Sequence, residues 1–97
     1  MPIFIKTETI KKEYINKQIL IKKIINEHKI WLKRLIEDGV NIKSGFLVDA
    51  LKHPGGGGLL MLEIKTYNDA LEIIQDDPMI RNNIVEWKLN EWIDITR

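Results

Sequence analysis

The sequence contains one histidine and one aspartate whose positions could support proton transfer. His28 falls on an apolar stripe that repeats every three or four residues, which is the spacing of one face of an α-helix. A carboxylate beside such a ring would hold one nitrogen protonated and leave the other free to move protons. Asp77 is the candidate partner, because Pro78 cannot continue a preceding helix in register and leaves Asp77 at a turn. The two residues would then form a general acid/base pair.

Both residues also have a structural interpretation. A histidine on an apolar helix face is often a core residue with no catalytic part. Asp77 stands where its side chain could cap one helical turn over residues 79–82. The capping role and the catalytic role can coexist, so both interpretations of Asp77 stay open.

Other residues are candidates for substrate binding rather than for catalysis. Ser44 lacks the Gly-x-Ser-x-Gly surroundings of a nucleophile elbow, so we interpret it as a strand serine or as a hydrogen-bond partner of substrate or of His28. The glycines at 55–58 lack the Gly-Lys-Ser/Thr ending of a phosphate loop and precede a strand, which favours a flexible hairpin connection. Asp49 is a weaker candidate for the rim of a pocket. Trp31 could line such a pocket, whereas Trp87 and Trp92 are expected to pack in the core or in a dimer interface.

The composition excludes several classes of protein and site. The 97 residues, 44% hydrophobic and 30% charged, suit one folded domain over residues 1–97. There is no cysteine and there are only two histidines, so we expect no disulfide and no metal site, and the proposed proton transfer by His28 and Asp77 requires no cofactor. No apolar run is long enough to span a membrane and no signal peptide is visible, so we expect a cytoplasmic protein without membrane contact. A net charge of +1, with lysines scattered around the predicted helix, argues against a nucleic-acid partner.

The elements that must position these residues follow from hydrophobic periodicity. Alternating residues predict strands over residues 3–9, 41–49, 59–64 and 85–95. A helical stripe covers residues 11–38 with a break near Lys17, and Thr9 offers a cap before it, while Gly39 ends it. A second helix begins after Thr66, and Asn83 suits the exit from the turn that follows it. The order β-α-β-β-α-β predicts an α+β, ferredoxin-like fold with a four-stranded antiparallel sheet.

The strand over residues 59–64 is apolar at successive positions, which predicts that both of its faces are covered. Two helices of the same chain can cover one face of the sheet, and no further helix is predicted for the other. A second copy of the chain is the simplest cover. We therefore expect a homodimer through the sheet faces, with a polar cavity between the stacked sheets.

An ordered set of short motifs resembles the YciI-like (YCII-related) family of small dimeric α+β barrel proteins. The resemblance runs from about residue 28 to residue 92 and implies sheet-to-sheet dimers with a pocket that holds a histidine and an aspartate. Some relatives are similar to dehydrochlorinases or to muconolactone-isomerase-like enzymes. Many members have proline where this chain has Phe46, a residue that could reshape the pocket. The motifs that carry the resemblance are His28 with Trp31 and Leu32, Gly39, Ser44-Gly45, the glycine-rich hairpin, Asp69-Ala70 and Asp77-Pro78.

Three functional hypotheses follow. The first is a cofactor-independent isomerase or lyase, of dehydrochlorinase type for example, in which His28 and Asp77 transfer protons on a small organic metabolite. Its substrate-binding residues would be Ser44, Gly45, Trp31 and Phe46. The second is a non-catalytic module that binds a small molecule in the same pocket or serves as a dimeric interaction domain. The third, nucleic-acid binding through the sheet, lacks the aromatic core motif of an RNA-recognition strand.

Overall fold

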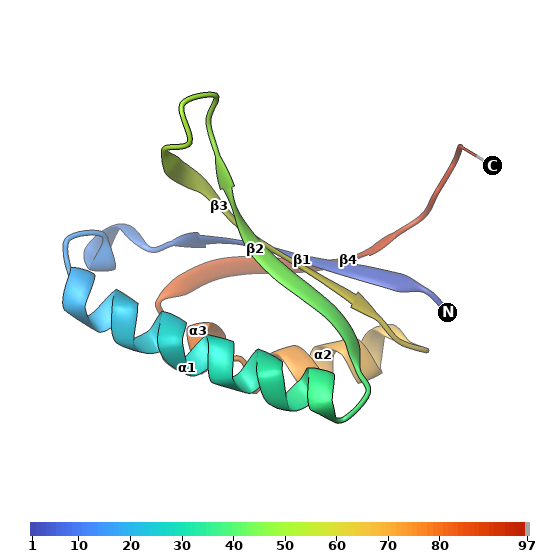
Figure 1. Cartoon of the computed structure of the whole chain (residues 1–97). Coiled ribbons are helices and arrows are strands. Elements are labelled where there is room, and N and C mark those ends of the chain that lie inside the picture. The colour runs from blue at the N-terminus through green and yellow to red at the C-terminus, as the bar shows by residue number, and fades with distance from the viewer. Residues whose placement is uncertain (97) are drawn as a thin grey trace.

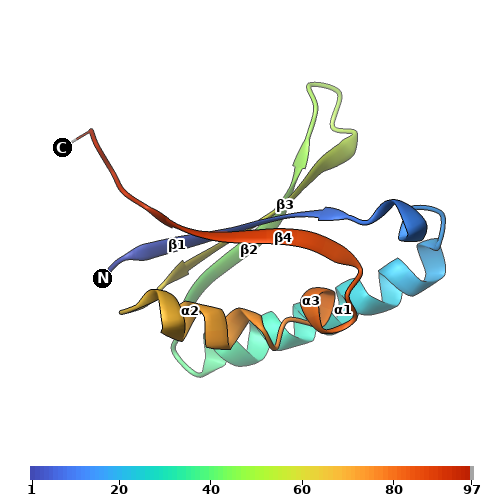
Figure 2. The same cartoon turned by 180° about the vertical axis from the view of Figure 1, so that it is seen from behind.

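The computed structural model describes residues 1–96, and it has the predicted ferredoxin-like architecture (Figure 1). Four strands form one antiparallel sheet in the order β2-β3-β1-β4. The helices lie together on one face of this sheet, and none of the described elements covers the opposite face (Figures 1 and 2). In chain order the elements are β1 (Ile3–Ile10), the 3-10 turn η1 (Lys12–Tyr14), α1 (Gln18–Glu37), β2 (Asn41–Val48), β3 (Pro54–Glu63), α2 (Tyr67–Ile74), α3 (Pro78–Arg81) and β4 (Val85–Trp92).

The long first helix breaks where its apolar stripe becomes irregular. The turn η1 precedes the break, and α1 begins at Gln18, close to the predicted position. Gly39 follows the helix with φ +87°, a conformation that glycine adopts without steric cost. The prediction of a Thr9 cap is wrong, because β1 continues through Thr9 and the turn begins after Lys11 without a side-chain cap.

The hairpin between β2 and β3 is shorter than predicted, because the glycine run belongs to a strand. β3 begins at Pro54, and the connection is held by the Asp49 carboxylate, which accepts from the backbone N–H groups of Leu51 and His53 at 2.8 and 3.0 Å. Gly57 has φ +89°, and a Cβ there would lie 2.5 Å from the backbone oxygen of Glu8. The glycines thus allow β1 and β3 to approach closely rather than making a loop flexible.

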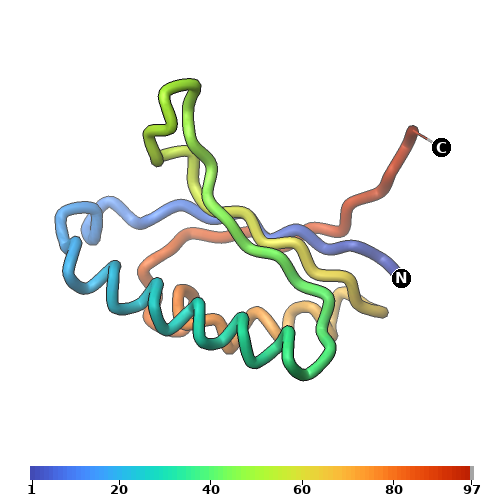
Figure 3. Tube along the Cα trace, in the orientation of Figure 1, coloured from blue at the N-terminus to red at the C-terminus, as the bar shows by residue number. Residues whose placement is uncertain are grey.

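The second half of the chain follows the predicted caps. The Thr66 hydroxyl accepts from the backbone N–H of Asp69 at 3.1 Å at the start of α2, and Asn83 has φ +55° after α3. β4 ends at Trp92, so the prediction that the strand continues to residue 95 is wrong. Trp92 pairs with Ile3, the first residue of β1, and little of β1 remains beyond that point for further pairing. The chain then leaves the sheet (Figure 3).

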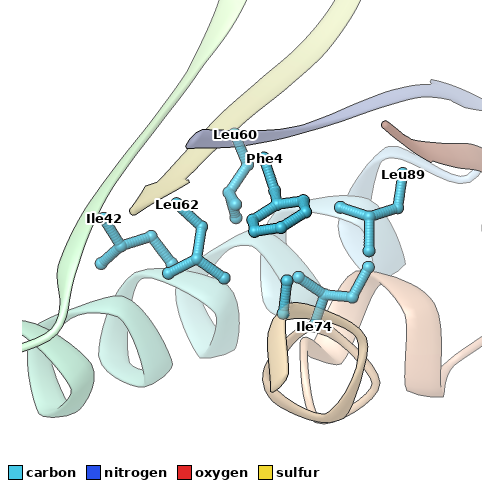
Figure 4. Close-up of a cluster of buried hydrophobic side chains, with 7 residues drawn as sticks. Phe4, Ile42, Leu60, Leu62, Ile74 and Leu89 are labelled. Carbon is cyan, nitrogen blue, oxygen red and sulfur yellow. The ribbon is translucent and has the colours of Figure 1, made fainter. Parts of the chain in front are cut away.

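The register of the sheet separates an inner face, toward the helices, from an outer face. Phe4 and Lys6 of β1 share the inner face with Leu60 and Leu62 of β3, whereas Ile3 and Ile5 point outward. Inner-face side chains meet α2 in the main core cluster (Figure 4). Its buried members are Phe4, Ile42, Leu60, Leu62, Ala70, Ile74 and Leu89.

The outer face of the sheet is partly apolar. Ile5 pairs with Met61, and Thr7 with Leu59, so these side chains stand on neighbouring strands in the middle of the face. Ile5, Leu59 and Met61 are only half-buried by their own neighbours, and Trp92 at the edge is exposed. Within residues 1–96, no helix combines the length and the apolar character that crossing a bilayer requires.

Candidate active site

The site is built around Asp77, whose side chain is 0% exposed. The residue precedes Pro78, the first residue of α3, and its extended backbone (φ −60°, ψ 123°) directs the carboxylate back over the helix start. Its Oδ1 accepts from the backbone N–H of Met79 at 3.0 Å. The sequence-based capping interpretation of Asp77 is therefore confirmed, and the carboxylate has further acceptor positions to use.

His28 approaches the same carboxylate from α1. Its Nδ1 lies 2.7 Å from Asp77 Oδ1, and the other ring nitrogen, Nε2, lies 2.9 Å from Ser44 Oγ on β2. The imidazole is 13% exposed, whereas Ser44 is on the surface of an edge strand. The fold thus brings together three of the predicted site residues, from α1, β2 and the start of α3.

Two charged residues that the sequence interpretation did not include complete the cluster. The ammonium group of Lys6, only 1% exposed, lies 2.5 Å from Asp77 Oδ2 and also forms an ion pair with Glu8 Oε1. Lys6 is on the inner face of β1 because strand side chains alternate and Phe4, two residues earlier, points into the core. This alternation can be read from the sequence. It predicts that Lys6 lies on the core face, where an ammonium group needs a buried carboxylate as its partner.

The Lys6–Asp77 ion pair and the His28 hydrogen bond set the charge of Asp77. Burial would raise the pKa of Asp77, but the hydrogen bond from His28 and the Lys6 ammonium together outweigh it and hold the pKa below its ordinary value of 3.8. Asp77 is therefore a carboxylate at neutral pH and can only accept hydrogen bonds.

This charge defines the roles of the two His28 nitrogens. Because Asp77 only accepts, Nδ1 must carry a hydrogen and donate it to Oδ1. In a neutral ring Nε2 then has a lone pair and accepts from the Ser44 hydroxyl; in a protonated ring Nε2 donates to Ser44 Oγ. The nitrogen that could exchange a proton with another molecule is the one beside the exposed edge strand.

The position of this cluster differs from the predicted cavity between stacked sheets. Ser44 shares its register row with Leu60 and Lys6, whose side chains are buried on the inner face. His28 and Asp77 come from the helix layer that covers the same face. The polar cluster thus lies between sheet and helices, because the alternation of β1 and β2 points both Lys6 and Ser44 toward the helices.

The remaining predicted residues do not all lie beside the cluster. The rings of Trp31 and His28 are 5.5 Å apart and tilted by 36°, so Trp31 adjoins the site. Phe46 is on the inner face but 71% exposed, beyond Ser44 on the hairpin. Gly45 belongs to the outer row of Leu59 and offers no side chain to the cluster. Asp49 holds the hairpin connection instead of the rim of a pocket.

The described part of the chain shows open hollows that the residues of this cluster do not line. One, of about 350 Å³, is lined by Glu27, Pro78, Arg81 and Asn82, and the other lies against the start of α1. Neither lining includes His28 or Ser44. Within residues 1–96, no group of three or more His, Asp or Glu side chains is arranged to hold a metal ion.

Comparison with known proteins supports the fold. No protein-family model and no curated protein sequence matches the chain. Its structure is similar to that of the 5-chloro-2-hydroxyhydroquinone dehydrochlorinase from Burkholderia phenoliruptrix AC1100, solved in complex with 2,5-dihydroxybenzoquinone, with a TM-score of 0.70 and 14% identity over 94% of this chain and 93% of that one. It is also similar to the de novo designed protein Ferredog-Diesel, with a TM-score of 0.58 and 14% identity over 93% of this chain and 84% of that one.

Proposed function

We propose that the protein is an enzyme in which His28, oriented by Asp77, acts as general acid/base on a small organic metabolite. The observation that carries the proposal is the pair of hydrogen-bond distances at the ring, 2.7 Å from Nδ1 to the buried carboxylate and 2.9 Å from Nε2 to an exposed hydroxyl. One nitrogen is anchored inside the fold and the other faces the surface. A substrate hydroxyl or acidic C–H at the position of Ser44 Oγ, or bound beside it, would be within reach of the base.

The proposed chemistry is isomerisation or elimination. In an elimination, Nε2 takes a proton from the substrate, the electrons of the broken bond form a new double bond, and the leaving group departs with the electron pair of its own bond. In an isomerisation, the same nitrogen returns the proton to a different atom. Neither route changes the oxidation state of the protein, and the charge on the ring is compensated by the Asp77 carboxylate.

The structural likeness supports one substrate class. The dehydrochlorinase named above acts on a chlorinated, hydroxylated ring, and this chain shares its fold along nearly the whole of both chains. Hydroxylated rings have weakly acidic O–H groups that a histidine can deprotonate. We therefore propose small hydroxylated or halogenated ring compounds as the first substrates to test.

The same arguments support two broader proposals. The ordered motifs around His28, Ser44 and Asp77, together with the shared fold, support the proposal that the chain is a distant relative of the YciI-like family. The half-buried outer face around Ile5 and Met61 makes a homodimer through the sheets the proposed assembly. In such a dimer the second copy would cover the outer face, while the His28 site would lie on the other side of each sheet.

The test is turnover with a matched pair of histidine variants. Chloride release from 5-chloro-2-hydroxyhydroquinone is measured without oxygen, and deuterium uptake from heavy water is measured for a panel of small phenols and enols. We expect His28→Ala to lower the rate by about 100-fold or more, the usual contribution of a general acid/base. His53→Ala removes the other histidine, which is exposed on the hairpin, and should keep the full rate.

Two results would contradict the proposed enzymatic function. If the wild-type protein acts on every compound no faster than His28→Ala, the catalytic proposal fails. If compounds also bind with an affinity that depends on His28 but none is consumed, the chain is a small-molecule-binding module instead.

A further inference from the structure

The proposed proton transfer does not use Lys6, yet Lys6 is the buried cation of the site. Its ammonium is 1% exposed and lies between two carboxylates, those of Asp77 and Glu8. Burying an ammonium group is costly unless partners compensate it. Lys6 contacts Asp77, and Asp77 in turn contacts the candidate base His28. A buried cation at this place is therefore expected to have a role in the site.

The hydrogen bonds of Asp77 indicate what Lys6 does. Oδ1 accepts from the Met79 backbone and from His28, whereas Oδ2 is occupied by Lys6 at 2.5 Å. Lys6 and the Met79 N–H can only donate, so each oxygen is held by a group that cannot reverse its role. The carboxylate is thus fixed in rotation by a donor at each oxygen, and the Lys6 ammonium at Oδ2 compensates its charge.

The state of the ring depends on that charge. Without the ammonium, a buried Asp77 would tend to bind a proton, because burial disfavours the ionised form. A protonated carboxyl group would donate to Nδ1 of His28, which would leave the ring hydrogen on Nε2. The nitrogen that faces Ser44 would then be a donor and could not act as a base.

Glu8 keeps Lys6 in place, and the glycine run makes room for Glu8. The Glu8 side chain is mostly buried beside Gly58, its register partner on β3. A Cβ at Gly58 would lie 3.0 Å from Cγ of Glu8, which is closer than ordinary contacts allow. The glycine therefore leaves the space in which the second carboxylate meets the ammonium.

We propose that Lys6 is a positioning residue: by holding Asp77 as a fixed carboxylate, it keeps the hydrogen of neutral His28 on Nδ1 and leaves Nε2 as the base. The inference rests on the proposed function only for the use of Nε2 in catalysis. The tautomer itself is a property of the free protein, and it can be measured without a substrate.

The experiment is ¹⁵N NMR of the histidine rings in the full chain, at a pH where the spectra show both rings neutral. The shifts distinguish a protonated ring nitrogen from a bare one, and His53→Ala assigns the signals. We expect the wild type to show hydrogen on Nδ1 of His28, and Lys6→Met to shift the population toward the Nε2–H form. Glu8→Gln keeps the Lys6–Asp77 pair and should retain the wild-type tautomer, as should Lys6→Arg, which restores the charge.

Lys6→Met leaves two carboxylates without their cation, so the double variant Lys6→Met/Glu8→Gln is measured as well, because it removes one charge of each sign. An Nε2–H ring in the wild type, or an unchanged Nδ1–H ring in either folded Lys6→Met variant, would overturn the proposal. If the tautomer follows Lys6 but no compound is turned over, the positioning role stands and the proposed enzyme fails.

Discussion

The Lys6 ammonium lies 2.5 Å from Asp77 Oδ2, although the two residues are 71 positions apart in the chain. Lys6 is on the central part of β1, and Asp77 is the N-cap of α3, so this contact joins the first strand to the last helical turn. Both side chains are buried, so bulk solvent cannot compensate the charge of either one if the other is removed. The ion pair therefore contributes both to the stability of the fold and to the charge of the site.

Lys6→Met is expected to destabilise the protein much more than the loss of a surface lysine does. It leaves the buried Asp77 without its cation, so the carboxyl group must either stay charged without compensation or take up a proton, and removing one partner of a buried ion pair typically costs about 3–5 kcal/mol. Lys33→Met removes an exposed lysine from α1 and should change the free energy of unfolding by less than about 0.5 kcal/mol. Urea denaturation followed by tryptophan fluorescence measures both. Equal losses in the two variants would contradict the importance of the buried pair.

Asp77 is expected to make stability fall in acid. Its pKa in the folded protein is below the ordinary value, mainly because the interactions with His28 and Lys6 outweigh burial. The unfolded chain thus takes up the proton first, so the carboxylate stabilises the fold fully above about pH 4 and loses this contribution as the pH falls through the lower folded-state pKa.

The measurement is the urea midpoint as the pH is lowered from neutral into the acid range. Asp77→Asn should flatten this decline, because it removes the titrating group. Asp76→Asn, an exposed neighbour, should decline as the wild type does. A wild-type midpoint that stays constant in acid, or an Asp77→Asn profile as steep as the wild type, would show that Asp77 does not have the lowered pKa.

The sequence predicted the fold well, because its signals are local. Alternation in β1, the break before Gln18 and the glycine after α1 each depend on a few neighbouring residues. The errors arose where pairing partners decide the outcome. The end of β4 depends on where β1 begins, and the glycine run became a strand because β1 passes close to Gly57.

The site was predictable only in part for a similar reason. The periodicity of α1 and the proline after Asp77 indicated both members of the pair that the structure joins at 2.7 Å. Lys6 was visible in the alternation of β1, but its partner is 71 residues away, and no local pattern identifies it. Whether the cluster lies on the inner or the outer face depends on the side of the sheet that the helices cover.

Gly57→Ala is expected to destabilise the fold by about 2 kcal/mol or more. Its positive φ is strained for any residue with a Cβ, at roughly 1–2 kcal/mol, and the new atom would also meet the Glu8 backbone oxygen. Gly45→Ala is the matched control, because Gly45 lies in a neighbouring strand with ordinary φ, and a Cβ added there would meet nothing within 4 Å. Thermal unfolding compares the two. Similar melting temperatures for both variants would show that β1 and β3 do not approach as closely as described.

Ser44→Ala is expected to reduce turnover without weakening the fold. The hydroxyl is exposed and its hydrogen bond to His28 Nε2 is worth about 1 kcal/mol, so the rate should fall about fivefold while stability changes by less than about 0.5 kcal/mol. Thr96→Ala removes an exposed hydroxyl from the segment that follows β4 and should leave the rate unchanged. Steady-state rates and urea midpoints of both variants decide the matter. An unchanged rate in Ser44→Ala would remove Ser44 from the site.

Met61→Lys is expected to convert a dimer into a folded monomer. Met61 pairs with Ile5 in the middle of the outer face, where a second copy would bury it, and a lysine there would lose its hydration at the interface. Asp76→Lys places an exposed lysine on the helix side, in place of a carboxylate, and should leave the dimer intact. Sedimentation velocity distinguishes one chain from two, and tryptophan fluorescence confirms folding. A wild-type monomer, or a dimer that survives Met61→Lys, would exclude assembly through this face, and the half-buried residues around Ile5 would then need a different cover.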